Sequence, residues 1–240
     1  ATMVQAAVPQ LMGLPNFNDE GVSLPHAYVP WWLTREQAAG KLGFPRGYHI
    51  EMGGGRMMPD PYGIMEVAKL SETVGPGLHE DMRRYYGSIV TLVGRGEMLP
   101  NAQSFCELDQ TVKDKFGLPV LRFNFAWGPH EKAQAEHQRS TFASVFEAMG
   151  AKLLTDITQP IDQAMSIGGS IIHELGTARM GAHASDSVVR DTCETWDVPG
   201  LYVVDGAMFA SNPDKNPTLT IMALTWRAME HLIAKLGRAA

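Results

Sequence analysis

Two polar residues in the last third of the chain, His173 and Asn216, have the side chains and neighbours expected of a redox or proton-transfer site. His173 begins the segment His-Glu-Leu-Gly-Thr-Ala-Arg-Met-Gly, which contains Gly176 and ends at Gly181. An imidazole titrates near neutral pH, so His173 can accept the hydroxyl proton of an alcohol while hydride leaves the carbon. The two glycines predict a backbone bent close to a ligand. For the other seven histidines, His49 among them, we expect structural roles.

Asn216 begins the segment Asn-Pro-Thr-Leu-Thr and is predicted to cap a long terminal helix. Asn is a favoured N-cap residue, and Pro217 fits the first helical position, where its missing N–H costs nothing. The first turn leaves backbone N–H groups without helical partners and carries partial positive charge, so it stabilises an anion. The electron-rich edge of a reduced flavin is such an anion. An ordinary helix cap would use the same residues, and both interpretations stay open here.

A third candidate is the pair Asp205 and Gly206, which follows an apolar run of strand type at residues 201–204. A glycine after a strand lets the backbone approach a bulky ligand closely. A plain turn would also use an Asp-Gly pair.

The elements that must position these residues divide the chain near residue 155. Residues 1–155 are predicted to form a sheet domain, after a stretch to about residue 30 that is rich in Pro, Gly and Asn. Four runs bounded by turn residues are predicted to pair as one antiparallel sheet: 48–52, 89–93, 104–108 and 120–125. A helix over residues 131–149 is expected to lie on this sheet. Residues 156–240 hold the candidate site and the terminal helix, so we expect an α+β fold.

Composition and charge argue against several classes of function. The chain of 240 residues is 45% hydrophobic and 19% charged, which is an ordinary globular composition. Its formal net charge of -6 and the absence of a Lys and Arg cluster argue against a nucleic-acid partner. The adjacent pair Arg83 and Arg84 is interpreted as solvated surface of a short amphipathic helix. No apolar run approaches the roughly 18 residues that span a bilayer. The compartment, periplasmic or cytoplasmic, stays undetermined.

The two cysteines, Cys106 and Cys193, have neither a metal-ligand spacing nor the pattern of a disulfide framework. We expect two free thiols, with a single bridge as the alternative, and we expect no metal site.

The order and spacing of the candidate segments resemble the C-terminal signature of the glucose-methanol-choline (GMC) flavin oxidoreductases. The resemblance covers about residues 173–234 and rests on the His173 segment, the apolar run with Asp205 and Gly206, and the Asn216 segment. It implies FAD as the cofactor and an alcohol as the substrate. It also implies that His173 acts as base or orients the substrate, and that Asn216 lies beside the flavin N5.

The same resemblance implies how FAD is held. Asp205 and Gly206 would contact its ribityl or pyrophosphate portion. The backbone of Pro217 and Thr218 would face the pyrimidine edge of its ring.

Residues 1–155 resemble the substrate-binding sheet of this family, most closely that of bacterial gluconate 2-dehydrogenase and glucoside 3-dehydrogenase flavoprotein subunits. Segments 29–32, 47–51 and 123–128 carry this likeness. It implies a sugar or glycoside substrate, with a small accessory subunit and a cytochrome electron acceptor as possible partners. Trp31, Trp32 and Trp127 would either stack on a sugar ring or fill the core of the sheet.

The chain departs from the family pattern at one point. A complete member opens with a Gly-x-Gly-x-x-Gly turn that holds the ADP half of FAD, and this sequence has no such turn in a β-α-β context. The Rossmann half is therefore expected to be absent from the chain. We expect the nucleotide-binding half of the same enzyme to complete the site.

Together these points predict FAD-dependent oxidation of a secondary alcohol on a sugar or glycoside. Two alternatives stay open. One is a non-catalytic fragment that binds a partner chain. The other is a metal-dependent hydrolase, which no His-x-x-x-His or similar spacing supports.

Overall fold

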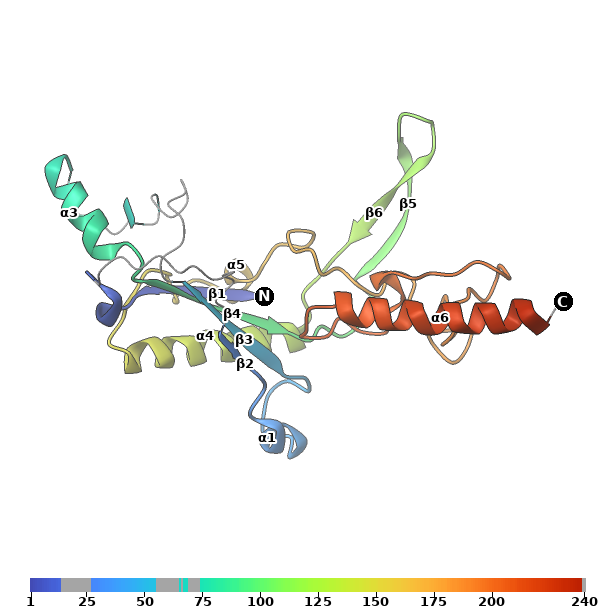
Figure 1. The fold of residues 1–240 in the computed structure, drawn as a ribbon, viewed down its shortest axis with the longest axis horizontal. Coiled ribbons are helices and arrows are strands. Elements are labelled where there is room, and N and C mark those ends of the chain that lie inside the picture. Colours follow the sequence, from blue (N-terminus) through green and yellow to red (C-terminus); the bar gives the residue numbers. More distant parts are fainter. Residues whose placement is uncertain (14–26, 55–64, 66, 69–73, 239–240) are drawn as a thin grey trace. The chain divides into compact units, whose positions relative to one another are not determined.

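The computed structural model of the chain describes residues 1–13, 27–54, 65, 67, 68 and 74–238, and shows an α+β fold built on antiparallel sheets (Figure 1). It divides into two compact units. Unit 1 holds residues 1–96 and 132–166, and unit 2 holds residues 97–131 and 167–240. The chain thus passes between the units three times, whereas the sequence predicts one boundary near residue 155.

Unit 1 is built on a five-stranded antiparallel sheet with the order β2-β3-β4-β1-β7. The strands are β1 (Thr2–Ala7), β2 (Ala27–Val29), β3 (Tyr48–Gly54), β4 (Ile89–Gly96) and β7 (Lys152–Leu153). The helices around it are η1 (Pro9–Leu11), α1 (Thr34–Ala38), α3 (Pro76–Tyr85), α5 (Ile161–Ala164) and α4 (Pro129–Ala148), of which α4 enters this unit at Lys132.

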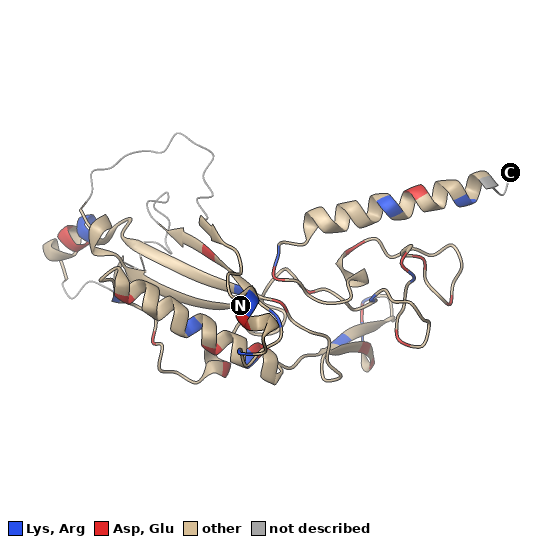
Figure 2. Cartoon of the chain, turned by 90° about the horizontal axis from the view of Figure 1, so that it is seen from below, with Lys and Arg blue, Asp and Glu red and all other residues tan. Residues whose placement is uncertain are grey.

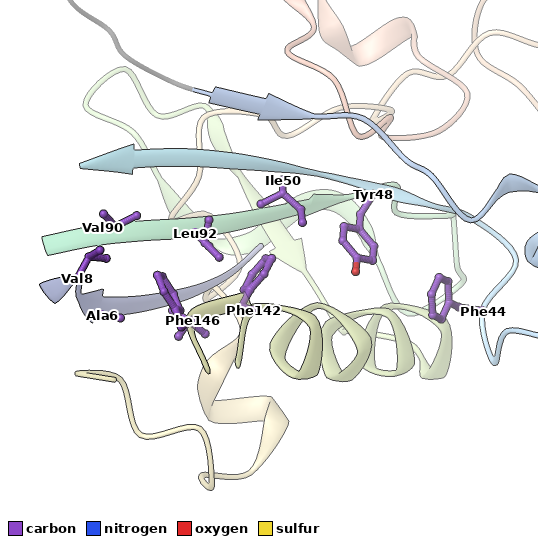
Figure 3. Close-up of a cluster of buried hydrophobic side chains, with 10 residues drawn as sticks. Ala6, Val8, Phe44, Tyr48, Ile50, Val90, Leu92, Phe142 and Phe146 are labelled. Carbon is purple, nitrogen blue, oxygen red and sulfur yellow. The ribbon is translucent and has the colours of Figure 1, made fainter. Parts of the chain in front are cut away.

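The core of unit 1 lies between one face of this sheet and α4 (Figure 3). Alternate residues of a strand point to the same face, so Val4, Ile50 and Leu92 meet Phe142 and Phe146 of the helix. Further along β4, two glycines replace apolar side chains on this face. A Cβ at Gly94 or Gly96 would collide with Gln138 or Gln134 of α4, so the missing side chains allow the helix to lie close to the sheet.

Unit 2 has less regular structure. It contains a two-stranded hairpin of β5 (Phe105–Lys113) and β6 (Pro119–Asn124), the 3-10 turn η2 (Gly206–Met208) and the terminal helix α6 (Thr218–Arg238). Its core is a second cluster in which Val189, Cys193, Met208, Phe209 and Ala228 are buried. This cluster joins η2 and α6, which begin at or directly after the candidate residues Asp205, Gly206, Asn216, Pro217 and Thr218.

Several predicted elements are confirmed. The helix predicted over 131–149 is α4, and Gly150 ends it with a φ of 61°. Arg83 and Arg84 are exposed on α3, as expected of a solvated pair. Both cysteines are free.

The prediction of a single four-stranded sheet is wrong. β3 and β4 pair within unit 1, while β5 and β6 pair only with each other in unit 2. Local alternation of apolar residues predicts a strand but not the strand with which it pairs. β5 and β6 pair with each other because a short turn joins them.

Two other predictions near the ends also need correction. Residues 201–204 form no regular strand, since only Tyr202 makes an isolated bridge, to Glu194. Tyr202 and Val203 instead pack on the second core cluster, which explains the apolar run.

At the N-terminus, β1 forms in the stretch where breakers were expected, because the breakers begin only at Pro9. Residues 14–26 of that stretch lie outside the described residues.

Candidate active site

The segment that begins at His173 runs alongside the turn that follows Asp205. Three backbone hydrogen bonds join them, with N–H donors and C=O acceptors in the order Gly176 to Gly206 at 3.1 Å, Ala178 to Ala207 at 2.9 Å and Met180 to Met208 at 2.9 Å. These bonds satisfy backbone groups that no helix or sheet pairs. The structure therefore brings two of the three candidate segments together.

Asp205 and Gly206 each have a defined local role in this turn. Oδ1 of Asp205 accepts a hydrogen bond from the Ala207 N–H at 2.8 Å and so caps η2, while the carboxylate stays exposed. A Cβ at Gly206 would lie 2.3 Å from Cδ2 of Leu175. The glycine makes room for Leu175, so packing within the chain already requires it.

His173 is half-buried and is held by a residue that the sequence interpretation missed. Nδ2 of Asn212 donates a hydrogen bond to the backbone carbonyl of His173 at 2.7 Å. Two backbone hydrogen bonds with Met98 fix Asn212 in turn. The Asn212 N–H donates to the Met98 carbonyl at 3.1 Å, and the Met98 N–H donates to the Asn212 carbonyl at 2.9 Å. Its only signal in the sequence is the Asn-Pro pair it forms with Pro213, which is typical of a turn. Asn212 thus connects His173 to the loop that leads to Asn216.

Helix α6 begins at Thr218, one residue later than predicted. The carbonyl of the buried Pro217 accepts the hydrogen bond of the Ile221 N–H at 2.9 Å, which starts the helical ladder. Asn216 and Thr218, on either side of Pro217, are exposed. The predicted start, with Asn216 as N-cap and Pro217 as the first helical residue, is therefore shifted by one residue.

The start of α6 has the electrostatics of an anion site. The first turn holds no acidic residue, and residues 218–226 carry no charge at all (Figure 2). The partial positive charge of the helix start is therefore not neutralised by the helix's own side chains. An anionic group placed there would be stabilised.

The core beneath these segments contains a residue with a strained backbone, Cys193. Cys193 adopts a φ of 65°, in the left-handed region that a residue with a Cβ rarely enters. Its Sγ lies 3.2 Å from Sδ of Met208 in η2. Burial raises the pKa of the Cys193 thiol more than the nearby Arg227 lowers it, so the thiol stays protonated. We assign it a packing role.

The three tryptophans predicted to stack on a sugar or fill the core have different surroundings. Trp31 packs on the first core cluster, and its Nε1 donates a hydrogen bond to Gln37 at 2.8 Å, so it fills the core. Trp32 is exposed and lies edge-on to Tyr48, with ring centroids 5.7 Å apart. Trp127 is half-buried and edge-on to Phe125 at 4.7 Å.

The residues present fit part of a flavin cofactor. The uncharged, exposed helix start suits the pyrimidine edge of the ring, which becomes anionic on reduction. The exposed carboxylate of Asp205 can accept hydrogen bonds from ribityl or ribose hydroxyls. Within the described ranges, no group of three or more His, Cys, Asp or Glu side chains is arranged to hold a metal ion. Nor does that part of the chain contain a helix long and apolar enough to cross a membrane.

The family model of GMC oxidoreductase matches residues 100–225, which is more than half of the chain and includes the candidate catalytic and cofactor-binding residues from His173 to Thr218. The chain belongs to the GMC oxidoreductase family. The resemblance drawn from the His173 and Asn216 segments is thereby confirmed at the level of the family.

Curated GMC oxidoreductases are similar to this chain over part of their length. The chain is 35% identical over 150 residues to 2-methyl-1,2-propanediol dehydrogenase of Mycolicibacterium austroafricanum, an alignment that covers 62% of the chain and 26% of that protein. It is 28% identical to the fructose dehydrogenase large subunit of Gluconobacter japonicus, over 68% of the chain and 28% of that protein. It is 25% identical to the gluconate 2-dehydrogenase flavoprotein of Pantoea cypripedii, over 59% and 23%. The chain therefore spans about a quarter of the length of these relatives.

Proposed function

We propose that this GMC oxidoreductase chain forms one wall of the active site of an FAD-dependent enzyme that oxidises a secondary alcohol of a sugar or glycoside. The observation that carries the proposal is the hydrogen-bonded assembly of the His173 segment, the Asp205 turn and Asn212 in unit 2. In this assembly the His173 segment lies beside a turn with an exposed carboxylate, and Asn212 joins it to the loop that leads to the start of α6.

In the proposed reaction His173 accepts the hydroxyl proton of the substrate at an imidazole nitrogen. The side-chain N–H of Asn216 donates a hydrogen bond to the substrate oxygen as it becomes a carbonyl. FAD, when bound, supplies the hydride acceptor, its N5 atom. The Asn212 hydrogen bond keeps the backbone of His173 in place, which preserves the orientation on which proton transfer depends.

The proposed cofactor contacts follow the exposed groups of unit 2. Asp205 would bind a ribityl or ribose hydroxyl, and the backbone at Gly206 would lie against the pyrophosphate side. The N–H of Thr218 would point to the pyrimidine edge, with Pro217 buried beneath it.

The nucleotide half of FAD would be held by residues outside these 240, because the sequence lacks the glycine-rich turn that binds it. The surface of α6 supports this proposal. Its inner residues Ile221, Leu224 and Met229 pack on the second core cluster, while Leu219, Met222, Trp226 and Ile233 are exposed. A helix that is apolar on both sides is typical of one buried between two layers, and we propose that the nucleotide-binding half is the second layer.

The sugar or glycoside substrate is proposed from the names of relatives, which act on a diol, on fructose and on gluconate. A large subunit among them supports a further proposal, that an accessory subunit takes part. A cytochrome electron acceptor is proposed from the family resemblance alone. The alternative is a non-catalytic fragment whose cofactor face is covered by a partner. Flavin absorbance in the enzyme that carries this chain would count against that alternative.

The test is a His173→Ala substitution in the flavin-loaded enzyme that contains this chain. We expect turnover to fall by roughly 100-fold to 10,000-fold, the usual contribution of a positioned general base, with the flavin still bound. His183→Ala is the matched control, because His183 is exposed and its hydrogen bonds, from Oγ of Ser187 and the N–H of Asp186, go to its backbone carbonyl. Unchanged turnover in His173→Ala would remove His173 from the mechanism.

A further inference from the structure

The first turn of α4 holds a backbone segment of unit 2 with two side chains that the proposed reaction does not use. Nε2 of His130 lies 3.0 Å from the backbone carbonyl of Glu97. Because a carbonyl only accepts, Nε2 is the His130 nitrogen that carries the hydrogen. Oε1 of Glu131 accepts a hydrogen bond from the N–H of Leu99 at 3.2 Å. Two consecutive side chains of the helix thus hold the backbone on both sides of Met98.

The way α4 begins fits Glu131 to this task. It is the third residue of the helix, and its Oε2 accepts a hydrogen bond at 2.8 Å from the N–H of Gly128, the residue before the helix. A carboxylate that reaches back in this way satisfies an N–H without a helical partner. Its other oxygen then bonds to Leu99, and the side chain is buried. A Cβ at Gly128 would lie 2.7 Å from Oε2, so the glycine makes room for the carboxylate.

Asn212 bonds to the same two peptide groups from the other side. The peptide group between Glu97 and Met98 accepts from His130 and donates to the Asn212 carbonyl. The next one, between Met98 and Leu99, accepts from the Asn212 N–H and donates to Glu131. Each peptide group therefore lies between α4 and Asn212, bonded to both. All these residues belong to unit 2.

The backbone of His173 depends on this arrangement, because it lies where its segment passes from open to held. Before it, Ile167 and Ile172 are 80% and 93% exposed, so the chain gains little from packing there. After it, the N–H of Gly176 is bonded to the turn that follows Asp205. The bond from Nδ2 of Asn212 to the His173 carbonyl lies at this boundary. Whatever fixes Asn212 therefore also limits the motion of the backbone that carries the imidazole.

We propose that His130 and Glu131 are positioning residues for His173, the base of the proposed reaction. They act through the two peptide groups at Met98 and through Asn212. The proposal rests on the proposed function and adds to it two side chains from the start of another helix. A positioning role for His130 agrees with the structural role expected of the histidines other than His173.

The test measures hydrogen–deuterium exchange in the flavin-loaded enzyme that contains this chain, because amide exchange reports local opening of the backbone. His130→Leu removes the donor to the Glu97 carbonyl. The Gly176 amide, which is bonded to Gly206, should then exchange about tenfold faster, the size of one lost hydrogen bond. Turnover, assayed with fructose, gluconate and methyl glucoside, should fall by up to about tenfold with the flavin still bound.

Two further variants separate positioning from general support. His130→Gln keeps an N–H donor on a side chain that can reach the Glu97 carbonyl, so it should restore both the exchange rate and turnover. His130→Leu combined with Asn212→Ala should exchange no faster at Gly176 than Asn212→Ala alone, because both changes break the same series of contacts.

Gln134→Ala is the matched control. Gln134 is buried one turn further along α4 and also donates to backbone carbonyls, those of Arg46 and Gly47, which do not contact Asn212 through this series. It should change neither Gly176 exchange nor turnover.

Glu131→Gln replaces His130→Leu if that variant does not fold. It leaves one acceptor oxygen for the two N–H groups of Gly128 and Leu99, and should accelerate Gly176 exchange in the same way. Unchanged exchange in a folded variant, effects that add to those of Asn212→Ala, or faster exchange without a loss of turnover would overturn the proposal. So would equal acceleration in Gln134→Ala. The expected exchange rates in an enzyme that oxidises none of the three compounds would contradict the proposed function but support the holding of the His173 backbone.

Discussion

At the scale of single residues, the sequence points to candidate side chains but not to the contacts that hold them. His173 and Asn216 stand out in the sequence because imidazole and amide chemistry coincide with unusual neighbours. Asn212 does not stand out, since its role depends on a hydrogen bond across 39 positions of the chain to the carbonyl of His173. Such a long-range contact leaves no periodic or local pattern to detect.

Asn212→Ala tests this support. The substitution removes the donor to the His173 carbonyl, so His173 should lose its fixed orientation and turnover should fall by roughly tenfold, with flavin content unchanged. Steady-state kinetics and flavin absorbance measure both quantities. Asn124→Ala is the comparison, because Asn124 makes only a 3.5 Å contact with Glu107 on the hairpin. If Asn212→Ala turned over at the wild-type rate, Asn212 would be a turn residue with no positioning role.

At the scale of elements, helices were predicted well because their periodicity and stop signals are local. α4 and α6 both appear, and Gly150 ends α4 as predicted. Strand partners and irregular loops were predicted less well. The Leu-Tyr-Val-Val run at 201–204 has strand-like residues, yet it belongs to a loop whose apolar side chains fill the second core cluster. Burial rather than strand pairing selected those residues.

The contact between Gly206 and Leu175 can be tested at this scale. Gly206→Ala would place its Cβ against the end of Leu175, so the turn or that side chain must shift, and we expect a loss of about 1–3 kcal/mol in the free energy of unfolding. Thermal or urea unfolding of the flavin-loaded enzyme measures the loss. Gly200 is unsuitable as a control site, because an alanine with its φ of 86° would be strained whatever space surrounds it. Gly43 is suitable, because a Cβ there would meet no atom within 4 Å.

Gly43→Ala should therefore have a much smaller effect. The double variant Gly206→Ala and Leu175→Ala should be more stable than the sum of the two single losses predicts, since each change relieves the other. If the two losses in the free energy of unfolding simply added, the Leu175 side chain would not be what restricts the size of the residue at position 206.

At the scale of the whole molecule, the chain exposes apolar surface that a separate globular protein would cover. Trp226 on α6 is 71% exposed, and Leu219, Met222 and Ile233 are similarly open. The hairpin adds Leu108, Leu121 and Phe123 on one of its faces. Contiguous exposed apolar surface of this kind marks an interaction site or drives aggregation.

We expect the 240-residue chain, prepared by itself, to self-associate at micromolar concentrations, as followed by light scattering. Trp226→Gln should reduce that association without lowering the melting temperature, because the side chain is exposed and its Nε1 contacts only Glu230 on the same helix. In the complete enzyme the same variant should weaken assembly with the nucleotide-binding half and reduce flavin content. Trp32→Gln, on exposed surface of unit 1, is the control. Full flavin content in the Trp226 variant would mean that another surface meets the nucleotide-binding half.

The interleaved path of the chain has a consequence for how the protein is made. β1 pairs with β4, in the register Thr2 with Gly94 to Ala7 with Ile89, so its partner residues are synthesised 82 to 92 positions later, and those of β7 later still. Unit 1 can be completed only after residues 97–131, which belong to unit 2, have been synthesised, because its second segment is residues 132–166. The hairpin β5–β6, by contrast, needs only its own residues and can pair as soon as they leave the ribosome. Among the strands of this sheet, β1 comes first in the chain and is among the last to complete its pairing, so we expect it to depend on protection from aggregation more than the hairpin does.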